Sequence, residues 1–516
     1  MTVNTIHGYL SVINKVKYKY MNTSYLSCNL SPLTVFVPNS ENPWDAIKVR
    51  HLHNRLGFGI ETSQIANALS KSPEAYVDEL ITAVINLPPT TIPVWAPLDP
   101  TEYTANGYTY GEDENYELVE ETQYTFIKEL INNGLRGRLI LFWHNHLVTE
   151  AYEYEFAGYA FRYFLTLQKN CLGNFKTFIS DIGKDEAMLR FLNGFENTAG
   201  SPNENYAREL YELFALGEGN GYTEDDITET SRALTGYNEY ANGDNSSILF
   251  NETTFDTDDK TIFGQTGNWG YDDVITILFD QKAELIARFI CEKIYFNFVS
   301  PEIDDEIHQN IINPLATIFI ANNFELAPVF RTLFKSEHFF DSKARNVIVK
   351  SPLDLIIQFM TTTGFNFGDF ELNKESIKYT AVLFGQDILN PPTVEGWKGN
   401  RDWINSGTIT FRAAYLCKDM LDWAWEQNQE QFRQFAITIS GNSNDADVVS
   451  KDIFEALMVE VPYTLDDFET GIDIFKSRVP SNYFEQNTWT LGFETAHLQV
   501  RDLIEYIVSL PDYQLK

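Results

Sequence analysis

Residues 200–226, GSPNENYARELYELFALGEGNGYTEDD, decide the fold class because their apolar positions follow a helical repeat. At about 100° per residue, four large apolar side chains of this stretch fall on one face. They are Tyr206, Leu210, Leu213 and Phe214. We expect this face to be buried, and the stretch therefore predicts an amphipathic helix.

The start of this helix and of the following one carries a capping signal. Ser201 precedes Pro202 and is followed by Glu204, which is the capping-box pattern with proline at the first helical position. Thr223 and Asp226 repeat the pattern after a glycine-rich stop. The sequence therefore predicts two capped helices, one that begins at Pro202 and one that begins just after Thr223.

The polar face of the first helix has two interpretations. Asn205, Glu209 and Glu212 share this face, and Arg208 lies beside them with Glu204 and Glu212 one turn away on either side. In the first interpretation this is a solvated face with internal ion pairs. In the second, Asn205, Glu209 and Glu212 point into a pocket, where the two carboxylates bind one hard cation or carry out acid–base chemistry.

Similar helical spacing recurs along most of the chain, which predicts a mainly α fold. We expect a partly irregular N-terminal extension over residues 1–41 and one large helical domain over 42–516. Within that domain, 42–240 and 270–516 are candidate sub-cores, since a chain this long exceeds one typical core. Turn formers among β-branched and aromatic residues predict a small β hairpin or loop insertion around 247–265.

The charge and the cysteines exclude several classes of function. The chain of 516 residues carries 73 acidic and 38 basic side chains, a formal net charge of −35, which repels nucleic acid and anionic membranes. The four cysteines form no C-x-x-C pair, so a cysteine zinc site is excluded.

No apolar run approaches the roughly 20 residues that span a bilayer, and the N-terminus lacks a secretory signal pattern. A cytoplasmic location is the default expectation, with the envelope or periplasm as the alternative if the start is wrong.

A second group of polar residues lies in the segment FWHNHLVTE, residues 142–150. On a strand, His144 and His146 would share a face and could bind one metal ion. The flanking pattern favours a helix, on which only one of them can face a given site, and His146 then pairs with Glu150. The competing interpretation is one buried histidine with satisfied hydrogen bonds and one surface histidine.

Two tryptophans lie in the loop NPPTVEGWKGNRDWINSG, residues 390–407. Trp397 and Trp403 are surrounded by glycine and proline, so they either pin this loop to the core or line the mouth of a pocket. We count both as candidate substrate-binding residues.

Four segments in order resemble the bacterial family called domain of unknown function 1800. The longest runs from GNFKTFISDIG to SRALTGY, residues 173–237, and contains the PNENYAREL helix. The others are HLHNRLGFG at 51–59, RLILFWHNHLVTE at 138–150 and LFGQDILNPPTVEGWKGNRDWINSGTITFR at 383–412. The resemblance covers most of the chain, from about residue 43 to beyond 415.

The resemblance implies no specific activity, because the family has none established. Its members are often encoded beside proteins similar to alkaline phosphatases and sulfatases, which makes such a protein a candidate partner. Many members carry export signals, and this chain shows none. Many also appear to have a histidine before an aspartate where this chain has Phe255, so a ligand at that position would be missing here.

Our leading hypothesis is an enzyme with a polar site between the 204–212 helix and the 143–146 segment. The predicted catalytic residues are Glu209, Glu212 and His144, and the predicted substrate-binding residues are Asn205, Arg208, Trp397 and Trp403. A divalent metal bound by His144, His146, Glu209 and Glu212 would make metal-assisted hydrolysis the reaction class. The alternative is a non-catalytic binding or assembly protein, with a glycan or protein partner, in which the same residues form a structural polar network.

Overall fold

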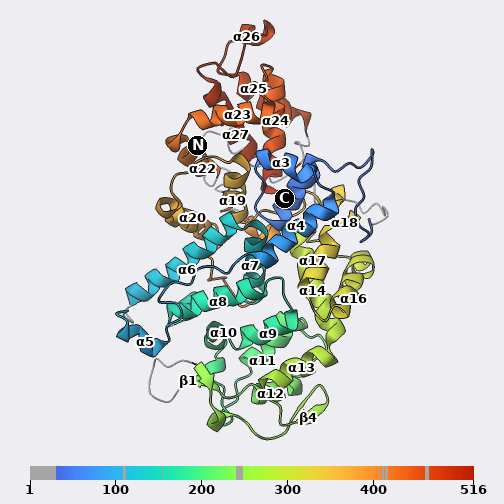
Figure 1. Cartoon of the computed structure of the whole chain (residues 1–516), viewed down its shortest axis with the longest axis vertical. Helices are drawn as coiled ribbons and strands as arrows, with labels where there is room; N and C mark the ends of the chain where they lie inside the picture. Colours follow the sequence, from blue (N-terminus) through green and yellow to red (C-terminus); the bar gives the residue numbers. More distant parts are fainter. Residues whose placement is uncertain are drawn as a thin grey trace.

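The structure, a computed structural model, describes most of the chain beyond residue 30. The described ranges are 31–108, 112–154, 156–239, 248–405, 407–408, 412, 417–459 and 464–516. Helices dominate these ranges, and the β structure within them is two antiparallel two-stranded sheets (Figure 1). The expected fold class, mainly α with a small β element, is confirmed. Residues 1–30 of the predicted N-terminal extension lie outside the described residues.

The N-terminal part of the chain up to the first strand is helical. Its elements are α2 (Ala46–Leu56), α3 (Thr62–Leu69), α4 (Pro73–Asn86), α5 (Pro100–Ala105), α6 (Glu112–Asn132), α7 (Gly134–His146), η1 (Ala151–Glu153), α8 (Ala157–Asn170), α9 (Phe175–Gly183), α10 (Glu186–Phe191), η2 (Gly194–Glu196), α11 (Asn205–Glu209), the π-helix η3 (Leu210–Ala215) and α12 (Glu224–Ala233).

The β structure consists of four short strands, of which β2 (Ile248–Phe250) and β3 (Lys260–Ile262) lie within the predicted insertion at 247–265. β1 (Tyr237–Glu239) pairs with β2, with Asn238 opposite Leu249. β3 pairs with β4 (Gln265–Gly267), with Thr261 opposite Thr266. The connection between β2 and β3 includes the short helix η4 (Glu252–Thr254).

Helices resume after β4 and continue to the end of the chain. The middle elements are α13 (Tyr271–Gln281), α14 (Ala283–Phe298), α15 (Asp305–Ile307), the π-helix η5 (His308–Ile312), α16 (Asn313–Ala321), α17 (Leu326–Phe334), α18 (Glu337–Phe340), η6 (Ser342–Ala344), α19 (Pro352–Thr363), α20 (Phe370–Leu383) and η7 (Asn400–Trp403). The last elements are α22 (Cys417–Gln427), α23 (Glu430–Ser440), α24 (Ala446–Leu457), α25 (Leu465–Lys476), α26 (Ser481–Glu485), α27 (Ala496–Ser509) and η9 (Pro511–Gln514).

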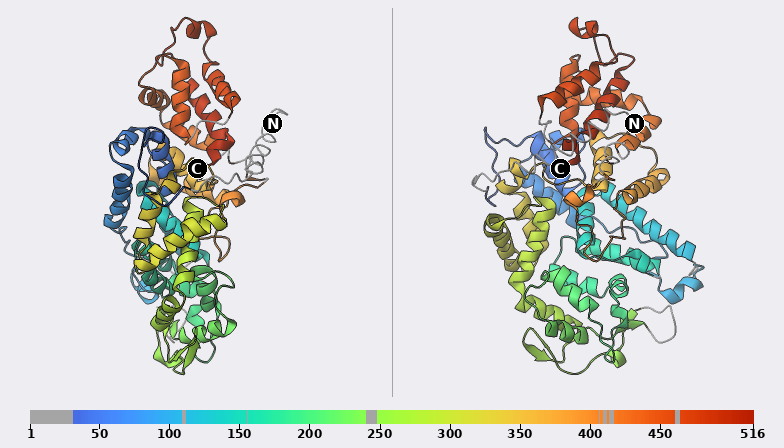
Figure 2. Two further views of the ribbon diagram at one scale, coloured as in Figure 1. Left: turned by 90° about the vertical axis from the view of Figure 1, so that its right-hand side faces the viewer. Right: turned by 180° about the vertical axis from the view of Figure 1, so that it is seen from behind.

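Helices α22 to α27 form a lobe at one end of the molecule, and the chain then returns to the middle (Figure 2). Within the lobe α27 packs against α22, α23 and α25. After η9 the chain pairs with the segment before α19, where the Lys516 N–H donates to the Ile348 carbonyl at 2.9 Å. Lys516 is therefore held in the interior of the molecule, between the lobe and the remaining helices.

The buried apolar side chains form one continuous cluster that includes both predicted sub-cores. Helix α13 packs against α9, and α14 packs against η3, so elements from the two sides of the 240–270 boundary share this cluster. On α14 the buried Ile286, Ile290 and Ile294 repeat at helical spacing. Full burial of each such side chain stabilises the fold by about 1.5–3 kcal/mol. The boundary at 240–270 is thus not a break in packing.

Local sequence signals explain where two important helices begin. The Ser72 hydroxyl accepts from the Ala75 N–H and Pro73 occupies the first turn of α4, as its sequence predicts. Helix α19 begins in the same way at Ser351, with Asp354 completing a capping box. This box fixes the backbone of Asp354, which becomes central to the site described below.

Residues 31–41 of the predicted extension run along α17 and α18. The Phe36 N–H donates to the Lys335 carbonyl at 2.8 Å, and the Phe36 ring packs on Phe340 with centroids 5.2 Å apart. This part of the extension is therefore integrated into the folded body. Among the described helices, none combines the length and apolar character needed to cross a membrane.

Candidate functional site

His144 lies in the last turn of α7 and is fully buried with both ring nitrogens used. Its Nδ1 lies 3.0 Å from the Tyr163 hydroxyl, and its Nε2 accepts from the Leu389 N–H at 3.0 Å. Because the Tyr163 hydroxyl donates to the Leu147 carbonyl, Nδ1 carries the proton of His144. Burial lowers the pKa of His144 to about 3. The predicted catalytic and metal-binding role of His144 is not supported, since its neutral ring joins three segments of the core.

His146 points in another direction, toward the π-helix η3. Its Nε2 lies 3.0 Å from the Phe214 carbonyl, which can only accept, so Nε2 carries the proton. Within the described residues the hydrogen bond of the ring is the one through Nε2, and the ring lines a large cavity. Burial, followed by the nearby charge of Lys293, lowers the pKa of His146 to about 3. The helix therefore separates the two histidines, as its geometry predicts, and turns one of them toward open space.

Asn145, between the two histidines, holds the tryptophan loop. We call residues 394–403 the W loop. The Asn145 Oδ1 accepts from the Trp397 N–H at 2.7 Å, and its Nδ2 donates to the Trp397 carbonyl at 3.0 Å. Gly396 has φ +80°, and a Cβ at this position would lie 2.4 Å from the Asn145 Oδ1. Asn145 was not among the residues predicted for the site, although its amide is flanked by two predicted site residues.

The helix that carries the 204–212 residues begins later than its sequence predicts. Ser201 forms a β-bridge with Thr198 and caps nothing, and α11 starts at Asn205, with Glu204 at the cap position but without a capping hydrogen bond. The predicted capping box at Ser201 is therefore wrong. The buried Asn197 explains the difference, because its side chain accepts from the Asn203 N–H and holds this entry segment in a non-helical path. The second box, at Thr223, is confirmed.

The predicted ion pairs around Arg208 exist and lie at the surface. The Arg208 guanidinium contacts Glu204 at 3.3 Å, Glu212 at 3.5 Å and Glu224 at 2.8 Å. The hydrogen bond with Glu224 is the main reason that the pKa of Arg208 is raised. Asn205 is exposed. Neither Arg208 nor Asn205 lines the cavity, and Arg208 joins α11 and η3 to α12 instead.

The two glutamates of this helix have different surroundings. Glu212 lines the cavity, whereas Glu209 does not. Burial and the neighbouring Glu212 raise the pKa of Glu209. From Leu210 to Ala215 the chain forms a π-helix, and such turns are frequent at functional sites.

The predicted ligands of a divalent metal do not come together. Within the described ranges no group of three histidine, cysteine, aspartate or glutamate side chains is placed to hold a metal ion. His144 uses its Nε2 lone pair on the Leu389 N–H, so it has no lone pair left for a metal. The four-residue site proposed from the sequence is thus not assembled.

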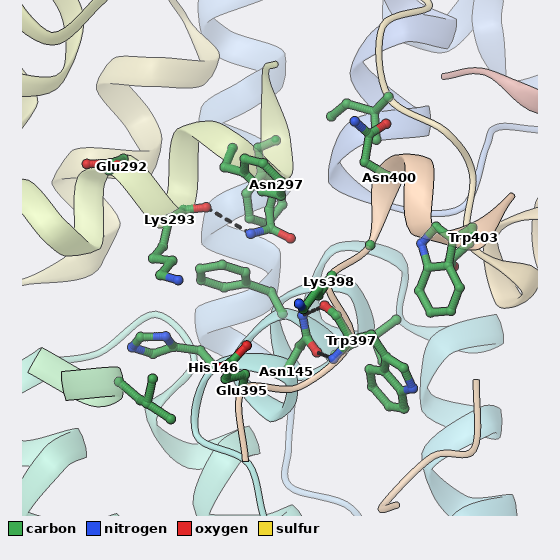
Figure 3. A pocket seen from close by; sticks show the side chains of 18 of the residues that line it. Asn145, His146, Glu292, Lys293, Asn297, Glu395, Trp397, Lys398, Asn400 and Trp403 are labelled. Carbon is green, nitrogen blue, oxygen red and sulfur yellow. Dashed lines mark hydrogen bonds between the residues drawn. The ribbon is translucent and has the colours of Figure 1, made fainter. Parts of the chain in front are cut away.

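The large cavity lies between α7, η3, α14, the segment before α19 and the W loop (Figure 3). Its volume is about 570 Å³. His146 and Glu212 line it together with Trp397 and Trp403, so four of the eight residues predicted from the sequence meet there. In Figure 3, the Lys293 side chain extends from α14 toward the His146 ring.

Five buried polar residues of this cavity form what we call the inner wall. It comprises Arg138, Ser351, Asp354, Gln386 and Lys516, all less than a tenth exposed. Asp354 binds Arg138 through Oδ1 and accepts from the Lys516 Nζ at 2.6 Å through Oδ2. Burial alone would raise the pKa of Asp354, but the charges of Arg138 and Lys516 hold it below its usual value. Burial, and then the charge of Arg138, lower the pKa of Lys516 to about 7.

The entrance of the cavity carries exposed charges of both signs, and we call it the rim. The rim comprises Glu218, Lys293, Glu395 and Lys398. Neither the rim nor the inner wall was predicted from the sequence. Lysines and glutamates are ordinary surface residues, and no local pattern separates these from the others.

Phe255, where the resemblance noted from the sequence implies a histidine in many members, lies between η4 and β3. Its ring is 5.6 Å from that of Phe250, and the Lys260 ammonium lies 4.6 Å from its centroid. Phe255 does not line the cavity.

Comparison with known proteins places the chain in a family. A family model described as a protein of unknown function, DUF1800, matches residues 51–515. No curated protein and no solved structure matches the chain. Because the match spans nearly the whole sequence, the chain belongs to the DUF1800 family.

Proposed function

We propose that the chain binds a small polar molecule in the large cavity. If the protein is an enzyme, it also carries out acid–base chemistry on this molecule. The observation that carries the proposal is the inner wall, where charged side chains are buried beside open space. Burying charge is unfavourable and adds little to packing, so such an arrangement is expected where a ligand uses it. The volume of about 570 Å³ lies within the usual range of ligand sites, roughly 300–1,000 Å³.

The W loop supports the proposal with an unused donor. The Trp397 indole Nε1 is buried and has no hydrogen-bond partner among the described residues. Buried indole N–H groups usually find an acceptor. The Trp403 ring lies beside it, with centroids 6.4 Å apart. These rings offer an apolar surface for the carbon skeleton of a ligand, in line with the substrate-binding role predicted for both.

His146 and Glu212 are the groups we propose for proton transfer. The His146 ring bonds the Phe214 carbonyl through Nε2, which leaves the lone pair of Nδ1 available, and Glu212 lines the same cavity as this ring. A hydrolytic reaction would use one of them to accept a proton from water. We leave the divalent metal out of this proposal, because its four predicted ligands do not converge.

A binding or assembly function without catalysis is the second candidate. The network of Arg208 with three glutamates favours it, because these ion pairs join α11 and η3 to α12 and tie Glu212 to Arg208 at 3.5 Å. In this case a glycan or a protein segment would occupy the W loop. Turnover, rather than binding, separates the two candidates.

Filling the cavity tests the binding proposal. Val394 lines the cavity, so Val394→Trp should block it, whereas Val448→Trp on α24 adds the same ring at a position that is 41% exposed and does not line the cavity. A library of small polar metabolites would be screened by thermal shift and by tryptophan fluorescence. We expect molecules that bind the wild type and Val448→Trp but not Val394→Trp. Equal binding to all three proteins, or no binding to the wild type, would refute the proposal.

A second experiment separates catalysis from binding. Each bound molecule would be incubated with the protein and followed by NMR spectroscopy. For an enzyme, His146→Gln or Glu212→Gln should retain binding and lose turnover, whereas Lys451→Gln on α24, an exposed lysine that does not line the cavity, should retain both. Unchanged ligand with every variant would support the non-catalytic candidate.

A further inference from the structure

The inner wall indicates which chemical class of ligand the cavity accepts. Building on the proposed function, we propose that the inner wall binds an oxyanion, and we call this binding site the oxyanion seat. The ligand of the cavity would then carry a carboxylate or a phosphate-like group. This group would lie against Lys516, Gln386 and Arg138. A wall of buried polar groups could in principle bind a cation or an amine instead, so the hydrogen-bond partners of these groups decide between the ligand classes.

The acceptors of the inner wall are already used. The Asp354 Oδ1 accepts from Arg138, and its Oδ2 accepts from the Lys516 Nζ at 2.6 Å and from the Ser351 N–H at 2.9 Å. The Gln386 Oε1 accepts from the Leu353 N–H at 3.0 Å. A cationic ligand would therefore have to compete with existing partners for each of these oxygens.

The donors of the same wall are not all used. Lys516 has three N–H groups, of which one is directed at Asp354. The Gln386 Nε2 has no partner among the described residues, although the side chain is only 3% exposed and lines the cavity. Asn400, which borders the wall, is similar: its Oδ1 accepts from the Val349 N–H at 3.0 Å, and its Nδ2 has no partner in the described part of the chain. The matching ligand group is one that only accepts hydrogen bonds, which is the property of an oxyanion.

The balance of charge supports the same conclusion. Counting only the side chains of the inner wall, Arg138 and a protonated Lys516 carry two positive charges against the one negative charge of Asp354. The other carboxylates that line the cavity, those of Glu212, Glu218, Glu292 and Glu395, lie outside this wall. The charged groups that act on Lys516 are Arg138 from α7, Asp354 from α19 and Arg55 from α2. Two of these three are cations, so an anion in the cavity would supply the missing counter-charge. It would also favour the protonated form of Lys516, and binding above pH 7 should take up a proton.

Sodium sulfate and sodium acetate are suitable probes, because neither anion changes its charge between pH 6.5 and 8.5 and they represent tetrahedral and planar oxyanions. Binding would be measured calorimetrically with the intact chain, at an ionic strength kept constant with sodium chloride. We expect saturable binding of at least one probe. Preference for acetate would identify a carboxylate ligand, and preference for sulfate a phosphate-like one.

Charge variants assign the site. Gln386→Glu keeps the acceptor for the Leu353 N–H and places a negative charge at the wall, so binding should weaken at least about tenfold, which is 1.4 kcal/mol. Lys516→Arg keeps the positive charge, so this variant should still bind the probe. Binding to the wild type should weaken between pH 7 and 8.5, whereas binding to Lys516→Arg should not. Lys451→Gln on α24, where the lysine is 58% exposed, is the matched control and should bind like the wild type.

The outcomes separate this inference from the proposed function. If neither anion binds, while neutral molecules still bind the wild type and not Val394→Trp, the oxyanion seat is wrong and the cavity remains a binding site. If Gln386→Glu binds the probe as tightly as Lys451→Gln does, the anion lies elsewhere and the seat is refuted. If Val394→Trp affects no ligand at all, the proposed function fails as well.

Discussion

Arg138 and Arg208 both pair with carboxylates, but they occupy opposite environments. Arg208 lies on the surface among Glu204, Glu212 and Glu224, with a third of its side chain exposed. Arg138 lies at the inner wall, where it is buried and pairs with Asp354. The surface network has more ion pairs, yet solvent screens each of them. This difference shows that the burial of charged groups, rather than their number, distinguishes a candidate site from a solvated helix face.

The same contrast holds between two buried carboxylates. Asp354 is paired with two cations, and its pKa is held below the usual value. Asp185 is just as buried but bonds only neutral donors, the Thr166 hydroxyl at 2.7 Å and the Ala187 N–H at 3.1 Å, and burial raises its pKa to about 7. Four substitutions test these contrasts, taken in order of the effect we expect.

Removing the charge of Asp354 should have the largest effect. Asp354→Asn leaves Arg138 and Lys516 buried without a counter-charge, and we expect the free energy of unfolding to fall by about 3–5 kcal/mol. The control is Asp272→Asn, because Asp272 pairs with Lys184 at 2.9 Å but its side chain is 82% exposed. The control should lose no more than about 1 kcal/mol. Urea denaturation measures both, and equal losses would abolish the contrast between buried and exposed pairs.

Gly396→Ala should come second. The new Cβ would lie 2.4 Å from the Asn145 Oδ1, at a φ of +80°. Gly441→Ala is the matched control, since Gly441 has φ +60° and nothing within 4 Å of the new Cβ. We expect about 1–2 kcal/mol of destabilisation from the left-handed backbone in both, and a further loss in Gly396→Ala alone. Similar unfolding midpoints for the two variants would show that the W loop does not need its contact with Asn145.

The pH dependence of stability should distinguish Asp185 from Asp354. In the folded state Asp185 holds its proton up to about pH 7, whereas an unfolded aspartate loses it near pH 3.8. Between these values the folded state binds more protons, so this group makes stability fall as pH rises, by at most about 1.4 kcal/mol per pH unit. Asp185→Asn should remove this part of the slope while keeping an acceptor for the Ala187 N–H. An unchanged slope from pH 4 to 7 in the variant would contradict the assignment.

Arg208→Ala should have the smallest effect. Its three glutamate partners are solvent-accessible, so we expect a loss of less than about 1 kcal/mol, and ligand binding in the cavity should be unchanged. A loss comparable to that of Asp354→Asn would show that the surface network matters as much as the buried pair. The measurement is the same urea titration, with the fluorescence binding assay beside it.

Part of the candidate site could be predicted from the sequence. His146, Glu212, Trp397 and Trp403 stand out by residue type and spacing, and they meet at the cavity. His144 stands out equally but is used inside the core, because Tyr163 and Leu389 occupy its two nitrogens. No pattern in the sequence distinguishes the two histidines, since the difference lies in what the rest of the chain places beside each ring.

The helix starts show the same limit at a smaller scale. Thr223 and Ser201 have equivalent capping signals, and only Thr223 forms its box. At Ser201 the side chain of Asn197 binds the Asn203 N–H at 2.9 Å and the Ser231 carbonyl at 2.8 Å. A cap is worth about 1 kcal/mol, so a competing tertiary contact of similar strength can displace it.

What the sequence determined by itself is the mainly α fold, the small β element and the capped starts of α4 and α12, because each depends on residues within a few positions of one another. Only the tertiary structure decided the inner wall. Arg138 and Asp354 are 216 residues apart, and Asp354 and Lys516 are 162 apart. Their charges become significant only when folding removes water from around all three, and the strength of an ion pair depends on that burial rather than on the residues themselves.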